Sequence, residues 1–199
     1  MGGTFNPIHN GHLLMAEYAA SEYGLSEVVF IPTGIQWMKR NNPDQLPSDT
    51  RLEMTKLAIA DNPLFSISDI EIKREGNTYT YETLQELTEA REDAQWYYII
   101  GADSLMNMEK WVHPEKIFAL AVILCAVRGE QDTKALKEIA DGLKERYNAD
   151  IRLLTMPRID LSSTDIRKRV AEQKSIRYMV PNEIDEYINH RGLYHVSEK

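Results

Sequence analysis

The sequence is poor in cysteine and in long apolar runs. Its one cysteine, Cys125, excludes an internal disulfide and a cysteine-rich metal site. The longest apolar run, IFALAVILCAV at residues 117–127, is too short to span a bilayer. It predicts the end of a helix followed by a buried strand, with Cys125 in the core. No charged segment followed by an apolar one opens the chain, so we expect a cytoplasmic protein.

Positive charge is also scarce. The 199 residues include 23 Lys and Arg against 31 Asp and Glu, a formal net charge of -8. This balance argues against a general nucleic-acid binder, whose affinity rests on a basic surface. A small phosphorylated ligand is still allowed, because it needs only a local cluster of cations and backbone N–H groups. With 43% hydrophobic residues, the chain is typical of one globular domain.

Strand and helix patterns alternate along most of the chain. Near-continuous apolar runs predict strands at residues 27–32, 65–72, 95–102, 120–127 and 150–155. Amphipathic stretches predict helices at residues 11–23, 48–60, 80–91, 114–119 and 133–147. The alternation implies right-handed crossovers, and therefore a doubly wound parallel α/β sheet of Rossmann-like type.

Two further helices are expected after the last strand. SSTDIRKRVAEQ is typical of a capped helix, and PNEIDEYINHRG begins with Pro181 and closes with Gly192. We interpret residues 161–199 as a small helical appendage of one domain that covers residues 1–199. The polar, proline-containing stretch 39–49 predicts a mobile loop. His113, His190 and His195 have no motif around them and are expected on the surface.

The first loop, GGTFNPIHNGH, has the composition of a phosphate site. In a doubly wound sheet, ligands bind beyond the carboxyl ends of the strands. Gly2 and Gly3 permit close backbone approach, and Asn10 is placed to cap the helix that follows. His12 then falls in the first helical turn with His9 just before it, so both rings can face a phosphate at the positive helix end. The loop is neither GxGxxG nor a Walker A motif, since no Lys follows the glycines.

Several blocks resemble a known family. GGTFNPIHNGHL resembles the HxGH signature of the nucleotidylyltransferase superfamily, and LSSTDIRKR resembles its ISSTxIR motif. NTYTYETL, IIGADSL with the following KW, and the terminal YMVPNEIDEYINHRGLY are similar to bacterial nicotinate-nucleotide adenylyltransferases over the full length. Two positions depart from that pattern. Asn6 stands where the family usually has Asp, and Lys39 lies in GIQWMKR, where many relatives are proline-rich.

The resemblance implies adenylyl transfer from ATP to nicotinate mononucleotide. The products are nicotinate adenine dinucleotide and pyrophosphate, and the reaction is a step of NAD biosynthesis. It implies direct in-line attack without a covalent enzyme intermediate, so catalysis rests on positioning and electrostatics. Mg²⁺ is expected to be carried by ATP, and no protein metal ligand is assigned.

The resemblance also implies site residues. The expected catalytic groups are His12, His9 and Arg167. The expected ATP-binding residues are Gly3, Thr4, Phe5, His9, His12, Gly101, Asp103, Ser163, Thr164 and Arg167. The expected ligands of nicotinate mononucleotide are Lys39, Tyr79, Thr80 and Trp111.

Plainer interpretations stay open for several of these positions. Trp111 also fits core packing, Asp103 and the serines at 162 and 163 fit helix capping, and Lys39 fits a solvated loop charge.

Other functions also stay open. An adenylyltransferase for phosphopantetheine or nicotinamide mononucleotide is the nearest rival, and a cytidylyltransferase is a weaker one. A nucleotide-binding module without turnover belongs to a different class. Nucleic acid and membranes are not expected partners, and a homo-oligomer is left open.

The start of the chain raises one more hypothesis. In this fold a short apolar strand precedes the first glycines and forms the middle of the sheet, yet only Met1 stands there. Losing a central strand removes core contacts and exposes strand edges. We therefore expect the natural protein to begin a few residues upstream; the alternative is a genuine truncation, which should fold poorly.

Overall fold

The computed structural model describes residues 1–36, 45–127 and 130–195. The helices are α1 (Asn10–Tyr23), α2 (Ser48–Ile59), α3 (Ile70–Lys73), α4 (Thr80–Ala90), α5 (Ala102–Asn107), the 3-10 turn η2 (Met108–Lys110), α6 (Pro114–Leu120), α7 (Glu130–Tyr147), α8 (Ser163–Ala171) and α9 (Asn182–Arg191). The strands are β1 (Gly2–Gly3), β2 (Val28–Pro32), β3 (Ile35–Gln36), β4 (Phe65–Ile67), β5 (Asn77–Thr78), β6 (Tyr97–Gly101), β7 (Val122–Val127) and β8 (Ile151–Thr155).

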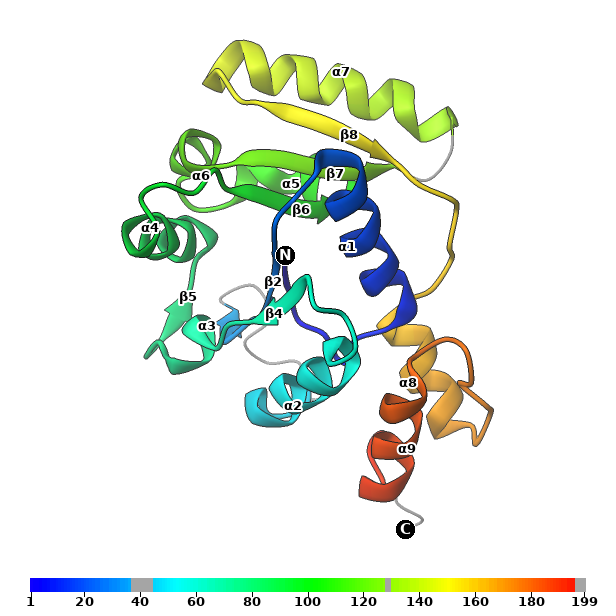
Figure 1. Cartoon of the computed structure of the whole chain (residues 1–199). Coiled ribbons are helices and arrows are strands. Elements are labelled where there is room, and N and C mark those ends of the chain that lie inside the picture. The colour runs from blue at the N-terminus through cyan, green and yellow to red at the C-terminus, as the bar shows by residue number, and fades with distance from the viewer. Residues whose placement is uncertain (37–44, 128–129, 196–199) are drawn as a thin grey trace.

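Two three-stranded parallel sheets meet at β1, and β3 and β5 form a separate two-stranded parallel sheet. One sheet has the order β1-β2-β4 and another β6-β7-β8, and β1 also contacts β6. The chain therefore winds outward from the middle in both directions, as Figure 1 shows. This arrangement confirms the predicted doubly wound α/β fold. It places the switch point, where such sheets bind ligands, beside β1.

Strand β1 is only two residues long. Gly2 pairs with Ile31 and Gly3 with Pro32. The terminal ammonium of Met1 donates a hydrogen bond to the carbonyl oxygen of Val29 at 2.8 Å.

Strand β7 shows why the sheet is buried on both faces. All six of its residues are buried. Ile123, Cys125 and Val127 belong to one hydrophobic cluster, whereas the alternate residues of the strand belong to the other. This period of two confirms that the run at residues 117–127 is a helix end followed by a buried strand. Burial raises the pKa of the Cys125 thiol to about 12, as befits a core residue.

The two C-terminal helices share the core of the N-terminal half. Ile166 and Val170 of α8, with Ile184 and Ile188 of α9, lie in the same cluster as residues of α1 and β2. Gly192 ends α9 in the left-handed region at φ 59°, where glycine is favoured. In Figure 1, α8 and α9 lie together at the end of the molecule opposite α7.

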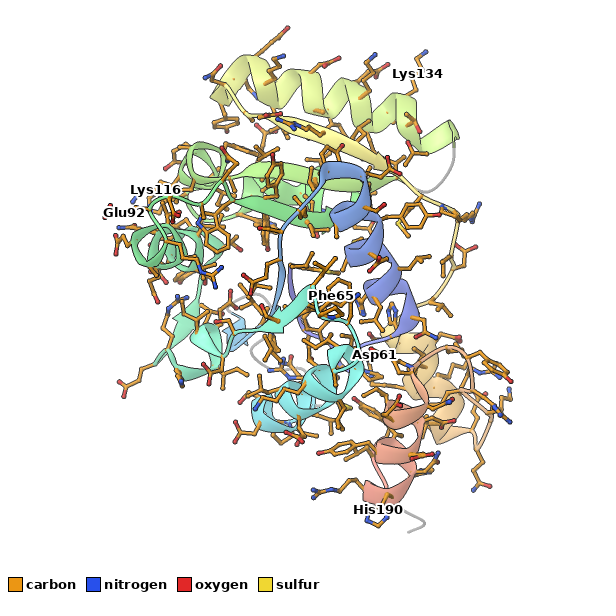
Figure 2. The ribbon with its side chains drawn as sticks, viewed as in Figure 1. Asp61, Phe65, Glu92, Lys116, Lys134 and His190 are labelled. Atoms are coloured by element: carbon orange, nitrogen blue, oxygen red, sulfur yellow. The ribbon has the colours of Figure 1, made fainter. Side chains whose placement is uncertain are left out.

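Charged side chains cover the outside of these elements. Figure 2 shows Glu92, Lys116, Lys134 and His190 projecting from the periphery. His113 and His195 are exposed as well, which confirms the predicted surface histidines. Among the described residues, no helix is long and apolar enough to cross a membrane.

The predicted strand at residues 65–72 is wrong in its second half. Strand β4 ends at Ile67, and α3 follows from Ile70. The chain leaves the sheet where the Ser68 hydroxyl accepts a hydrogen bond from the N–H of Ile70 at 3.4 Å. Such local bonds compete with a strand ladder. The sequence prediction also missed β3, β5 and α5, which are too short for a periodic pattern to mark.

Candidate functional site

A cavity of about 1000 Å³ opens at the carboxyl ends of β1 and β6. Ten of the predicted site residues line it: Gly3, Thr4, His9, His12, Tyr79, Thr80, Gly101, Asp103, Trp111 and Ser163. Phe5, Thr164 and Arg167 do not line it. Lys39 lies outside the described residues, as does the first part of the loop predicted at residues 39–49. The fold therefore gathers both predicted subsites around one space.

The loop after β1 is shaped by a close contact between Gly3 and Phe5. A Cβ atom on Gly3 would lie 2.6 Å from Cε1 of Phe5, so a larger residue there would force the Phe5 ring to shift. Phe5 itself has a φ of 47°, which is uncommon outside glycine. Its buried ring meets the ring of His12 edge-on, with 5.1 Å between centroids. The Phe5 ring thus packs against the His12 ring and limits its movement.

The two histidines stack and have a defined hydrogen bond between them. Their ring centroids are 3.6 Å apart, with 19° between the planes. The backbone N–H of His9 donates to Nδ1 of His12 at 3.2 Å. A neutral imidazole that accepts at Nδ1 carries its proton on Nε2. His12 is therefore set to donate from Nε2 to an anion.

Helix α1 begins one residue earlier than predicted. Asn10 is its first residue, and His9, in an extended conformation, is the N-cap. The prediction that Asn10 caps this helix is therefore wrong. Its side chain instead donates to the carbonyl oxygen of Tyr178 at 2.7 Å, which ties α1 to the segment before α9.

The two serines before α8 have separate partners. The Ser162 hydroxyl accepts a hydrogen bond from the N–H of Asp165 at 3.0 Å and caps the helix. The Ser163 hydroxyl donates to the carbonyl oxygen of Pro7 at 2.8 Å. The capping alternative thus holds for Ser162, whereas Ser163 fastens α8 to the histidine loop beside the cavity.

Arg167 fastens the same loop. Its Nη1 donates to the carbonyl oxygen of Asn6 at 2.9 Å, and its Nη2 to the exposed Thr164 hydroxyl at 3.4 Å. The guanidinium in this conformation therefore holds the backbone of the loop.

Asn6 connects three distant segments. Besides Arg167 on its carbonyl oxygen, its Oδ1 accepts from the Tyr194 hydroxyl at 2.9 Å and from the N–H of Leu46 at 3.3 Å. Tyr194 lies near the C-terminus, and burial raises the pKa of its hydroxyl well above the usual value. Asn6 thus keeps the acceptor that the family's Asp would offer to these donors, without its charge.

Arg51 is the main site-supporting residue that the sequence prediction missed. It is 1% exposed. Its guanidinium donates to the carbonyl oxygens of Thr4 at 2.7 Å, Thr33 at 2.7 Å and Leu46 at 3.1 Å. An arginine within an amphipathic helix pattern suggests a solvated face, so only the structure shows this role.

Aromatic side chains line the other side of the cavity. Tyr79 is the N-cap residue of α4 and Trp111 follows η2, and the Tyr98 ring meets Trp111 edge-on at 6.3 Å. Trp111 both packs on a core cluster and lines the cavity, so its two interpretations hold together. Burial raises the pKa of Tyr98 to about 12, which keeps its hydroxyl protonated.

Two carboxyl groups border this side of the cavity. Asp103 lies in the first turn of α5, whose N-cap is Gly101, and no side chain caps that helix. The capping alternative for Asp103 is therefore wrong, and its side chain lies at the cavity. Glu71, which the sequence prediction missed, is buried, and this burial raises its pKa. The Thr83 hydroxyl donates to Glu71 Oε1 at 3.0 Å and opposes that rise.

The chain is similar to proteins of known families. Residues 1–169 match the model of the cytidylyltransferase-like family. A probable nicotinate-nucleotide adenylyltransferase of Lachnoclostridium phytofermentans is 45% identical over 194 residues, which cover 98% of this chain and 96% of the relative. One from Caldicellulosiruptor bescii is 42% identical over 97% of this chain and 96% of the relative.

The fold recurs in a solved enzyme. Nicotinic acid mononucleotide adenylyltransferase of Plasmodium falciparum, complexed with NaAD, superposes with a TM-score of 0.77 at 20% identity, over 97% of this chain and 94% of that one. The same enzyme complexed with APC gives a TM-score of 0.75. At such identity the likeness concerns the fold, whereas the sequence relatives establish membership: the chain belongs to the nicotinate-nucleotide adenylyltransferase family, among the cytidylyltransferase-like proteins.

Proposed function

We propose that the protein transfers the adenylyl group of ATP to nicotinate mononucleotide, giving nicotinate adenine dinucleotide and pyrophosphate for NAD biosynthesis. One observation carries the proposal. A single cavity has the stacked His9 and His12 and the start of α8 on one side and Tyr79 and Trp111 on the other. The family to which the chain belongs supports the same reaction.

The proposed step needs no protein nucleophile. A phosphate oxygen of the mononucleotide attacks the α-phosphorus of ATP, and the bond from that phosphorus to the bridging oxygen of pyrophosphate breaks. The electron pair leaves with pyrophosphate, so negative charge builds on the leaving group. Nε2 of His12 donates a hydrogen bond to that charge, and the helix end behind it adds a positive potential.

Arg167 and Ser163 contribute by position in this proposal. Both hold the backbone between Asn6 and Pro7, just ahead of the histidines. A shift of about 1 Å in such a site can cost a hundredfold in rate. Lys39 is still proposed to bind the mononucleotide phosphate, and Tyr79, Thr80 and Trp111 its nicotinate riboside.

Magnesium enters the proposal with the substrate. In the part of the chain that is described, no group of three or more His, Cys, Asp or Glu residues is arranged to hold a metal ion. A triphosphate offers the oxygen ligands that Mg²⁺ prefers. We therefore treat Mg²⁺ as part of the ATP complex. Cytoplasmic location and a homo-oligomer stay predictions.

The test measures pyrophosphate release. ATP and Mg²⁺ are offered with nicotinate mononucleotide, nicotinamide mononucleotide or phosphopantetheine. We expect strong preference for nicotinate mononucleotide and a loss of about 100-fold to 1000-fold in kcat for His12→Ala. His190→Ala, at an exposed position of α9, is the matched control and should behave like wild type. A preference for another acceptor contradicts nicotinate mononucleotide as the proposed substrate. If folded protein releases no pyrophosphate, the result favours a nucleotide-binding module without turnover.

A further inference from the structure

The connection between β8 and α8 brings an arginine to the cavity. Arg158, Asp160 and Leu161 all line it, beside Ser162 and Ser163 at the start of α8. Arg158 is 72% exposed in its side chain, and Nε donates to both carboxylate oxygens of Asp160, at 3.0 and 3.2 Å. Asp160 is 68% exposed. The sequence prediction overlooked both residues.

The charges around the cavity make Arg158 distinctive. Among the described residues that line it, Arg158 is the one lysine or arginine, whereas Glu71, Asp103 and Asp160 carry carboxyl groups. Arg167 does not line the cavity, and its Nη1 donates to the carbonyl oxygen of Asn6. A triphosphate is a polyanion, and the forked guanidinium is the side chain best suited to binding phosphate oxygens.

The ion pair with Asp160 is easily exchanged. Two exposed side chains, two residues apart, gain little from pairing in water, because solvent screens their charges. A phosphate group that approaches in the cavity offers more charge than one carboxylate, so it can displace Asp160 from the guanidinium.

We propose that Arg158 leaves Asp160 when ATP binds and donates hydrogen bonds to the β- and γ-phosphates, the group that departs as pyrophosphate. Asp160 holds the guanidinium while the cavity is free of nucleotide. This inference rests on the proposed function, because it assigns a ligand to the leaving group of that reaction.

The two partners of the ion pair give opposite effects in the test. Arg158→Met removes the phosphate donor and should raise the KM for ATP about tenfold or more, with the KM for nicotinate mononucleotide unchanged. Arg158→Lys keeps the charge but loses the fork, so its effect should be intermediate. Asp160→Asn frees Arg158 and removes a carboxylate from the cavity, so the KM for ATP should fall by about twofold to fivefold.

Arg152→Met is the matched control. Arg152 also pairs with an aspartate two residues away, Asp150, which lies just before β8, and it does not line the cavity. The KM of Arg152→Met for ATP should equal that of wild type. A rise in KM for Asp160→Asn, or no rise for Arg158→Met, overturns the proposal.

The reverse reaction separates phosphate from adenine as the partner of Arg158. With nicotinate adenine dinucleotide and pyrophosphate as substrates, Arg158→Met should raise the KM for pyrophosphate about tenfold and leave that for the dinucleotide unchanged. The opposite split means a contact to the adenylyl part and overturns the assignment. If wild type shows no turnover, the proposed function fails, and titration calorimetry of Mg²⁺–ATP with the same variants still decides the role of Arg158.

Discussion

Two connections border the cavity, and they are held in opposite ways. The loop after β1 receives hydrogen bonds at the backbone carbonyl oxygens of Thr4, Asn6 and Pro7, from side chains of α2 and α8. The connection after β8 carries an exposed ion pair between Arg158 and Asp160.

This difference separates two tasks that a site for a polyanion has to perform. Charge-stabilising groups such as His12 need fixed positions, because they act without reorganisation. A cation that binds the leaving pyrophosphate has to exchange its carboxylate partner for phosphate oxygens, so it cannot be held rigidly. Substitutions that release the first connection should therefore destabilise the protein, whereas substitutions in the second should change its stability little.

The largest effect is expected at Arg51. Arg51→Met leaves the buried carbonyl oxygen of Thr33 and the partly buried ones of Thr4 and Leu46 without this donor, and we expect the free energy of unfolding to fall by about 3–5 kcal/mol. Arg51→Lys should also destabilise, because an ammonium cannot reproduce the three-way fork. Urea unfolding measures both. Arg146→Met, which breaks an exposed pair with Glu109, is the control, and a loss below about 1 kcal/mol for Arg51→Met contradicts the assigned role.

A smaller effect is expected at Tyr194. Tyr194→Phe removes one hydroxyl donor from Asn6 Oδ1, while the N–H of Leu46 still donates to it. The free energy of unfolding should fall by about 1 kcal/mol, and kcat/KM by several-fold. Tyr178→Phe, at an exposed tyrosine, is the control.

A double-mutant cycle with Asn6→Ala tests whether the Tyr194 effect passes through Asn6. We expect a coupling of about 0.5 kcal/mol or more between the two substitutions. Additive effects mean that Tyr194 acts through some other contact.

These residues also mark the limit of what the sequence predicts. Near-continuous apolar runs located the buried strands, because both faces of a strand such as β7 are buried and therefore apolar. The HNGH spacing predicted that both histidines lie at a helix start, which the structure confirms, whereas the stacking of their rings was not predicted. Arg51 and Tyr194 were missed because they reach partners as far as 47 and 188 residues away along the chain. No local pattern encodes such contacts.

The sequence prediction missed short elements for a related reason. Strands β3 and β5 have two residues each and pair with one another, Ile35 with Asn77 and Gln36 with Thr78. A strand of that length has no measurable alternation, so only the tertiary pairing defines it. Asp103 shows the converse case: a local capping rule fitted the sequence, yet Gly101 took the N-cap position.

A further, pH-dependent effect is expected at Glu27, and its size should lie between those expected at Arg51 and at Arg158. Its carboxylate accepts from the Ser66 hydroxyl and from Arg91, and these two partners, Ser66 first, hold its pKa below the usual 4.5. The stabilisation is therefore present above about pH 4.5 and is lost as the pH falls through the lower pKa of the folded state. Since the side chain is 31% exposed, solvent screening limits the effect to about 1 kcal/mol or less.

Thermal unfolding between pH 3 and pH 7 measures this contribution, because these ends lie about 1.5 units below and about 2.5 units above the usual pKa of 4.5. Glu27→Gln should lower Tm at pH 7 and converge with wild type near pH 3. Glu145→Gln, at an exposed position of α7, is the control. A Tm difference that grows toward low pH contradicts the sign of the pKa shift.

The smallest effect is expected at the second connection. Arg158→Met and Asp160→Asn should each change Tm by less than about 2 °C, because an exposed ion pair contributes little to the folded state. That result would distinguish Arg158 from Arg51, although both arginines lie near the cavity. Arg51 stabilises the folded chain, whereas Arg158 can exchange its partner for a ligand. Saturating Mg²⁺–ATP should raise the Tm of wild type more than that of Arg158→Met, since stabilisation by a ligand follows its affinity. Equal shifts in the two proteins, or a large loss of Tm without nucleotide, would place Arg158 among the structural arginines instead.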